Sequence, residues 1–220
     1  MAAAAGPNVV KNGLVFALDA GNTQSYPGSG TTWTDLSGNN NTGTLTNGPT
    51  FSSDDGGYID FDGTNDRVET SSDMFNPNAN FTFSVWIKFD TVDSTSTIIS
   101  DFTNTGSIQI AYATAASGIR IVKSFVSTVD TFSNSALSAN IWYHITITRL
   151  SNTYKLYIDG SFISEFTDTK TYSRGAQSIG VNYNGNSAFD GKISSIYCYS
   201  KRLTESEVLQ NYKALKNRFV

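Results

Sequence analysis

The stretch WYHITITRLSNTYKLYIDG, residues 142–160, decides the fold. Residues 142–148 and 154–159 alternate apolar and polar side chains, and a period of two is typical of a strand with one apolar face. Ser151-Asn152 between them favours a turn. Asp159-Gly160 favours a tight hairpin, because both central residues of a type I′ turn need positive φ. We therefore predict a three-stranded meander whose apolar face must be covered by a second sheet.

Similar short strands follow one another along most of the chain. The clearest is FTFSVWIKFD, residues 81–90, in which the residues from Phe81 to Phe89 at odd positions share one face. Residues 63–66 join two more strands, and residues 22–49 form mostly loop. The other expected strands are 13–20, 58–62, 67–69, 97–101, 107–112, 119–124, 178–181 and 192–200. Strands at this spacing, with no helices between them, indicate an all-β antiparallel sandwich or barrel.

The C-terminal residues depart from this pattern. Thr204 and Glu207 have the spacing of a capping box, in which each side chain bonds the other residue's backbone N–H. Apolar residues then recur at helical spacing, which predicts a short amphipathic helix that docks on the sandwich. We expect one domain over residues 13–220, preceded by a tail at 1–12 that serves as an anchor.

Composition excludes several classes of protein. The 220 residues carry a net charge of −4 without a basic stripe, so we expect no nucleic-acid partner. No apolar run approaches the ~20 residues of a membrane helix, so we expect no membrane insertion. The N-terminal residues lack the basic and apolar regions of a secretory signal. The single cysteine, Cys198, is expected to fill space in the core.

A series of short motifs resembles the laminin-G-like, concanavalin-A-like jelly-roll domains of the Laminin_G_3 type. The resemblance runs from Gly13 almost to the end, and it implies a jelly-roll sandwich. The motifs that carry it, in chain order, are WTDLSGN (33–39), DFDG (60–63), FTFSVW (81–86), WYH (142–144), LYIDG (156–160), FDGKI (189–193) and LTESE (203–207).

The same resemblance bears on catalysis. Hydrolases on this fold use a Glu-x-Asp-x-(x)-Glu cluster on one strand. None of the four glutamates, which are Glu69, Glu165, Glu205 and Glu207, stands in that pattern. His144 is the only histidine and belongs to the WYH motif, so we expect it to be structural. We therefore predict that the chain is not an enzyme.

Calcium is the metal to consider. Asp60, Asp62, Asn65 and Asp66 place oxygen ligands close together, either for calcium or for an Asx-turn hairpin, and we favour the hairpin. Family members often hold a calcium between the first and last strands. Asp19 and Asp190 are candidate remnants of that site, but Ser194 stands where an acidic residue is expected. We predict no cofactor, with a structural calcium as the alternative.

Aromatic and amide side chains that we expect on the surface are the candidates for contact with glycans. Aromatic rings stack on sugars and amides bond hydroxyls. Trp86 and Trp142 lie on the polar faces of their strands, where they either meet a glycan or are covered by flanking loops, and we favour the covering. The candidate glycan-contact residues are Trp86, Tyr112, Asn182, Tyr183 and Asn184.

The N-terminal run LDAGN (18–22) with SYPGSGTTW (25–33) resembles a narrower version of the domain, found in structural proteins of tailed bacteriophages. It implies a non-catalytic protein on the virion surface, either a capsid decoration or a fibre head. Its expected partners are capsid or other virion proteins, host surface glycans and further copies of itself. The alternative is a free extracellular carbohydrate-binding lectin module, and the least favoured function is a glycan hydrolase or lyase.

Overall fold

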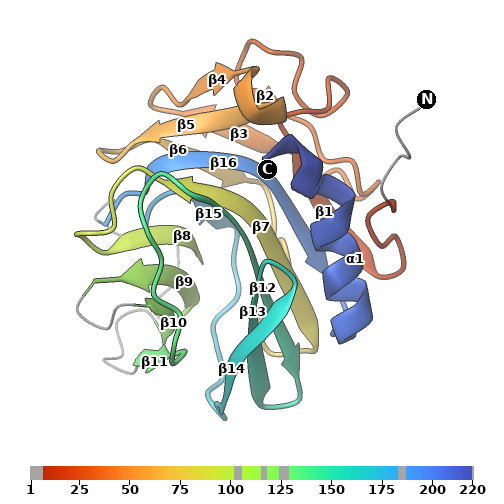
Figure 1. Ribbon diagram of the computed structural model, residues 1–220, viewed down its shortest axis with the longest axis vertical. Helices are drawn as coiled ribbons and strands as arrows, with labels where there is room; N and C mark the ends of the chain where they lie inside the picture. Colours follow the sequence, from red (N-terminus) through yellow and green to blue (C-terminus); the bar gives the residue numbers. More distant parts are fainter. Residues whose placement is uncertain (1–6, 102–105, 115–117, 124–128, 183–186, 220) are drawn as a thin grey trace.

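A computed structural model describes residues 7–101, 106–114, 118–123, 129–182 and 187–219. Within these residues, two antiparallel sheets of eight strands each pack face to face as a jelly-roll sandwich, and one α-helix lies on the outside (Figure 1). The predicted fold class is confirmed. No helix of the described residues has the length and apolar character needed to cross a membrane.

Sheet A begins at β14 and ends at β4. Its strands, in spatial order, are β14 (Ser161–Thr167), β13 (Thr153–Ile158), β12 (Trp142–Leu150), β7 (Phe81–Phe89), β16 (Asp190–Tyr199), β5 (Tyr58–Asp62) and β4 (Thr50–Ser52), while β1 (Leu14–Asp19) also pairs with β16. The meander β12–β13–β14 is the one predicted. Asp159 and Gly160, with φ of 52° and 77°, form its second turn.

Sheet B begins at β11 and ends at β2. Its strands, in spatial order, are β11 (Val129–Thr131), β10 (Gly118–Lys123), β9 (Ile108–Ala113), β8 (Ser96–Asp101), β15 (Gln177–Ile179), β6 (Arg67–Thr70), β3 (Gly43–Thr46) and β2 (Thr32–Trp33). The strands β4 and β11 were not predicted, because three residues are too few to show an alternation. The strands β2 and β3 lie within the predicted loop.

The main core lies between the two sheets. On β7 the odd-numbered residues from Phe81 to Phe89 all point into it, as the alternation predicts, and each is 0% exposed. Cys198 on β16 is also buried there, in agreement with the expected role of a space filler. Trp33 anchors the long N-terminal loop in the same core.

One predicted hairpin is wrong. Residues 58–62 and 67–69 were expected to pair with each other, but β5 pairs with β4 and β16 in sheet A, while β6 pairs with β3 and β15 in sheet B. The Asx-turn contacts are nevertheless present, since Asp66 accepts from the Asp62 N–H at 3.1 Å and Asp62 accepts from the Thr64 N–H at 2.8 Å. The same turn chemistry therefore carries the chain from one sheet to the other.

The helix α1 (Glu205–Leu215) lies on the outer face of sheet A (Figure 1). The predicted capping box is confirmed, with Thr204 and Glu207 each bonding the other's backbone. After the 3-10 turn η2 (Lys216–Arg218), the Phe219 ring stacks on Trp86 with ring centroids 4.3 Å apart. The C-terminal residues thus build a second apolar cluster outside the sandwich.

The end of the expected N-terminal tail also packs on this helix. The Val10 N–H donates to the Asn211 side chain at 2.8 Å, and Gln210 donates to the Asn8 carbonyl at 2.8 Å. Val10 is 7% exposed. Residues 8–10 are therefore structurally part of the domain, whereas residues 1–6 lie outside the described residues.

Candidate functional site

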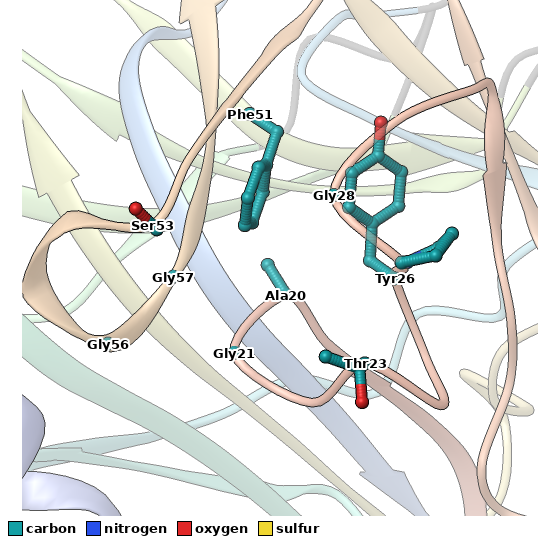
Figure 2. Close-up of a pocket in the computed structure, with 10 residues that line it drawn as sticks. Ala20, Gly21, Thr23, Tyr26, Gly28, Phe51, Ser53, Gly56 and Gly57 are labelled. Atoms are coloured by element: carbon teal, nitrogen blue, oxygen red, sulfur yellow. The ribbon is translucent and has the colours of Figure 1, made fainter.

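A cleft of about 350 Å³ opens between the loop that follows β1 and the 3-10 turn η1 (Asp54–Gly56) that follows β4. Figure 2 shows the rings of Tyr26 and Phe51 next to each other, with Ala20 below Phe51 in this view. None of its lining residues carries a charged side chain. They are Ala20, Gly21, Thr23, Tyr26, Pro27, Gly28, Phe51, Ser53, Gly56 and Gly57.

The two aromatic rings are held in place before any ligand arrives. Their centroids lie 5.3 Å apart with the planes tilted by 43°. Tyr26 is 4% exposed and donates from its hydroxyl to the Gly30 carbonyl at 2.6 Å, while Phe51 is half-buried. Phe51 therefore offers a ring surface that a ligand can reach, and Tyr26 supports it from the interior.

The floor of the cleft depends on two glycines that touch. A Cβ added to Gly57, which has φ of +99°, would come within 2.6 Å of the Gly21 Cα, and a Cβ on Gly21 would meet the Gly56 carbonyl oxygen at 1.9 Å. No side chain fits at this contact. The two loops can close the cleft from below only because both positions are glycine.

Asp19 fixes one of these loops. Its carboxylate accepts from the Gly21 N–H at 3.0 Å and forms a two-point ion pair with Arg218, at 2.6 and 2.9 Å. Asp19 is one of the expected calcium remnants, and here a guanidinium from the C-terminal segment faces it. Ser194, which stands where an acidic residue was expected, donates instead to the Gly57 carbonyl at 2.6 Å.

The chemistry of this cleft suits an uncharged ligand with an apolar face and hydroxyl groups. Thr23 and Ser53 are exposed on either side of it and add two side-chain hydroxyls to the rim. An aromatic ring can pack against the C–H face of a sugar, and hydroxyls can bond its edge. The cleft has no titratable lining residue except the Tyr26 phenol, whose pKa is raised by burial.

A second groove, of about 300 Å³, is acidic. It is lined by Asn47, Gly48, Thr50, Asp60, Phe61, Asp62, Asp66, Asp90 and Asp190. Lys192 stands between two of its carboxylates, 2.6 Å from Asp90 and 3.5 Å from Asp60. Burial raises the pKa of Asp60 in spite of this ammonium. Among the described residues, no group of three or more acidic, His or Cys side chains is arranged to hold a metal ion.

Two of the predicted glycan-contact residues lie in the interior. Trp86 is 2% exposed because Tyr212 and Phe219 stack on it. Tyr112 is 3% exposed and packs on Phe89 in the main core. The expected exposure of Tyr112 is wrong. The covering of Trp86 was favoured from the sequence, but C-terminal residues and not flanking loops provide it. Neither ring offers a face to a sugar in this structure. The sequence contained a signal for Tyr112, since it shares a face with Ile108 and Ile110.

The other three candidates belong to one loop. Asn182 is 9% exposed. Tyr183 and Asn184 lie outside the described residues, so their contact with glycans stays a prediction. Trp142, the other tryptophan of the polar faces, is half-buried beside Phe219 and donates from its indole N–H to Asp55 at 2.8 Å.

His144 lies beside Trp86, directly across from it on β12, and is 1% exposed. Its Nε2 is 2.8 Å from the Ser84 hydroxyl, which is 0% exposed. Burial lowers the pKa of His144 to about 3, so the ring is neutral at ordinary pH. A Ser–His pair is thus present, but both groups are buried and no substrate reaches them in this structure.

Sequence reasoning missed the cleft itself. Tyr26 lies in the stretch predicted to be mostly loop, and Phe51 stands in a stretch without strand alternation. The available signal was the run of small residues at Ala20-Gly21 and at Gly56-Gly57. Small residues far apart in sequence cannot be paired without the fold, because any of them also fits an ordinary turn.

Comparison with solved structures supports the fold. The chain is 17% identical to domain 4 of AbnA, a GH43 extracellular arabinanase from Geobacillus stearothermophilus in complex with arabinotriose, with a TM-score of 0.73 over 90% of this chain and 98% of that one. It is 16% identical to Trypanosoma rangeli sialidase in complex with the inhibitor DANA, with a TM-score of 0.70. That match covers 96% of this chain and 34% of the sialidase. The botulinum neurotoxin serotype D binding domain is 17% identical, with a TM-score of 0.69, over 92% of this chain and 52% of that one.

The chain therefore spans about a third of the sialidase and about half of the neurotoxin binding domain. A search of curated protein sequences finds no match. The Laminin_G_3 family profile, described as the concanavalin A-like lectin/glucanases superfamily, matches residues 62–209, well over half of the chain. The resemblance seen in the sequence motifs is confirmed at this level, and the chain belongs to the concanavalin A-like lectin/glucanases superfamily.

Proposed function

We propose that this chain is a non-catalytic adhesion domain that holds a neutral sugar in the cleft against the exposed side of the Phe51 ring. The observation that carries the proposal is a preformed cleft with one reachable aromatic ring, exposed hydroxyls and no charged lining. A sugar would stack its C–H face on Phe51 and bond its edge to Thr23 and Ser53. The family and the arabinotriose complex of a similar domain support a carbohydrate as the ligand.

Binding of the intact chain to a glycan array, followed by calorimetry on the best ligand, tests this proposal. Phe51→Ala should weaken binding about tenfold or more, since it removes the stacking surface and part of the apolar contact. The matched control is Phe162→Ala, which removes a ring that is 47% exposed on β14, at the far edge of sheet A. Equal affinity of the wild type, Phe51→Ala and Phe162→Ala for the glycan would show that the cleft is not the binding site. The absence of binding to any glycan would reject the proposed function.

We propose further that the domain is displayed on the surface of a tailed-phage virion, as a capsid decoration or fibre head, and touches glycans of the host. The support is the resemblance of residues 18–33 to phage structural proteins. Mass spectrometry and labelled-antibody imaging of purified particles provide the test. Absence from the particles would favour the alternative, a free extracellular lectin module, for which the likeness to a domain of an extracellular arabinanase is the favouring observation.

Glycan hydrolysis is the remaining candidate, and the acidic groove is the observation in its favour. A hydrolase needs one carboxyl with a raised pKa beside an ionised one. Asp60 has a raised pKa, but Lys192 already pairs with both Asp60 and Asp90. We expect no reducing sugar to be released from any glycan that binds. Release that Asp60→Asn abolishes would replace the adhesion proposal with an enzymatic one.

A further inference from the structure

Arg218 contacts both loops that form the floor of the cleft, although it does not line the cleft itself. One loop carries Gly21 and the other carries Gly56 (Figure 2). A Cβ added to Gly56 would come within 2.9 Å of the Arg218 Cβ, and one added to Gly21 would come within 2.8 Å of its Nη1. The side chain of Arg218 therefore lies directly against the backbone of both loops.

The Arg218 guanidinium also fixes the first loop through a carboxylate. It holds Asp19 at two points, and Asp19 in turn accepts from the Gly21 N–H at 3.0 Å. The Asp19 side chain is only 6% exposed, and the Tyr197 hydroxyl donates to its other oxygen at 3.3 Å. Two charge-assisted bonds in a planar fork set the orientation of a carboxylate as well as its position. The path of the loop at Gly21 thus depends on Arg218.

Phe219, the next residue, supports the second loop through Trp142. The two rings lie 4.7 Å apart, centroid to centroid. The Trp142 indole N–H donates to Asp55 in the turn η1 at 2.8 Å, and the Lys88 ammonium donates to the same oxygen at 3.0 Å. Gly56 directly follows Asp55, so this contact also limits the movement of a residue that lines the cleft.

The two loops carry the groups that would meet a sugar. Thr23 lies on the loop of Gly21, and Ser53 lies on the loop of Gly56, shortly after Phe51 on β4. Glycine gives a loop conformational freedom and no side-chain contacts of its own, so groups packed from outside set its path. A change in the separation of the loops would therefore change the distances among the two hydroxyls and the ring together.

We propose that the C-terminal segment, residues 216–219, controls the affinity of the cleft for a neutral sugar, and that Arg218 is its positioning residue. The inference rests on the proposed function, because it takes a sugar in the cleft as given. Arg218 does not touch the sugar. It holds the two loops at one fixed separation, so that the ring and the hydroxyls of the cleft act on the same sugar unit. By linkage, a sugar that binds this arrangement must in turn stabilise the docked segment.

Calorimetry with three neutral trisaccharides, arabinotriose, xylotriose and cellotriose, tests the proposal on the full chain. If none of them binds, the strongest neutral glycan of the array takes their place. Arg218→Met keeps an apolar stem and removes the guanidinium, and it should weaken binding of the best probe about tenfold, because the loops lose their common support. Arg218→Lys keeps the charge without the fork, so its affinity should lie between those of the wild type and Arg218→Met.

Arg149→Met is the matched control. Arg149 is also buried, at 5% exposed, and donates to the carbonyls of Pro77 and Ala79. It stands at the end of β12 opposite to Trp142, so its loss should lower the melting temperature and leave the affinity for the probe unchanged. All affinities are measured at a temperature at which thermal melting shows every variant to be folded. The control thereby separates a loss of stability from a loss of cleft geometry.

Hydrogen exchange provides a readout that a merely structural role would not change. Saturation of the wild type with the best probe should slow amide exchange in α1 and η2, although the sugar contacts neither element. Arg218→Met should reduce this protection. Trp142→Phe removes the indole bond to Asp55 but keeps a ring beside Phe219, and it should weaken binding about two- to threefold.

Equal affinity of the wild type and Arg218→Met for the probe, or equal loss in Arg218→Met and Arg149→Met, would overturn the inference. So would amide exchange in α1 and η2 that saturation with the probe leaves unchanged. If a neutral glycan binds through Phe51 and Arg218→Met does not weaken it, the inference is wrong and the proposed function stands. If no trisaccharide and no glycan of the array binds, both are rejected.

Discussion

The outer faces of sheet A and sheet B are covered in different ways. On sheet A, Tyr212 and Phe219 stack on Trp86, and His144 below them is 1% exposed. On sheet B, Arg120 stands among short side chains without a charged partner in the described chain. Strand alternation therefore predicts which residues point away from the core, but a distant segment decides whether solvent or a ligand reaches them.

Among the variants proposed here, substitution of Arg218 is expected to change the free energy of unfolding most, and substitution of Arg120 least. Arg218→Met should lower the free energy of unfolding by about 3 kcal/mol, because Asp19 would keep a buried carboxylate without its counter-charge. Urea denaturation measures this. The double variant with Asp19→Asn should recover a large part of the loss. An unchanged loss in the double variant would mean that packing, rather than charge, accounts for the effect.

The covering of sheet A by the C-terminal residues can be tested with two phenylalanines. Phe219→Ala should cost about 2 kcal/mol, since it removes a half-buried ring from Trp86 and Trp142. Phe162→Ala, at a ring that is 47% exposed, should cost less than about 0.5 kcal/mol. Thermal unfolding with tryptophan fluorescence measures both. Similar losses would contradict the difference in packing.

His144 should make the covered face sensitive to acid. Burial lowers its folded pKa to about 3, so below the unfolded value of about 6.5 the unfolded chain binds a proton that the folded chain does not. The contribution of neutral His144 to stability is therefore fully present above pH ~6.5. As the pH drops toward 3, the free energy of unfolding falls by about 1.4 kcal/mol per pH unit. Denaturation between pH 6.5 and 5 isolates this slope from most carboxylates. His144→Gln should flatten it, and an unchanged slope would assign it to other groups.

The smallest effect is expected on sheet B. Arg120→Gln should change stability by no more than about 0.5 kcal/mol, or raise it slightly, because it removes a partly buried cation whose Nε has no hydrogen-bond partner. Urea denaturation beside Arg218→Met makes the comparison direct. A loss as large as that of Arg218→Met would show that Arg120 contributes to the packing of sheet B.

The local part of the fold could be predicted from sequence. The alternation of residues 142–160, the Asp159-Gly160 turn and the Thr204 cap all depend on neighbours within a few positions, and all are confirmed. The predicted hairpin at residues 58–69 failed for the opposite reason. Its turn residues were identified correctly, but the choice between one sheet and two depends on strands far away in sequence.

The candidate site could be predicted much less well. The burial of Trp86 depends on Phe219, which is more than a hundred positions away and meets it only after the helix docks. The cleft depends on contact between two glycines, Gly21 and Gly57, whose residue type signals a turn wherever it occurs.

The docking of residues 8–10 on α1 and of Phe219 on Trp86 has a mechanical consequence. Asn8 and Val10 are tied to α1 by two hydrogen bonds, and Phe219 holds the other end by stacking on Trp86. A stretching force applied through the two ends would act on these few contacts one after another, as in unzipping, before it loads the strands of the sandwich. Tension alone would then uncover Trp86, and its fluorescence would report the pull.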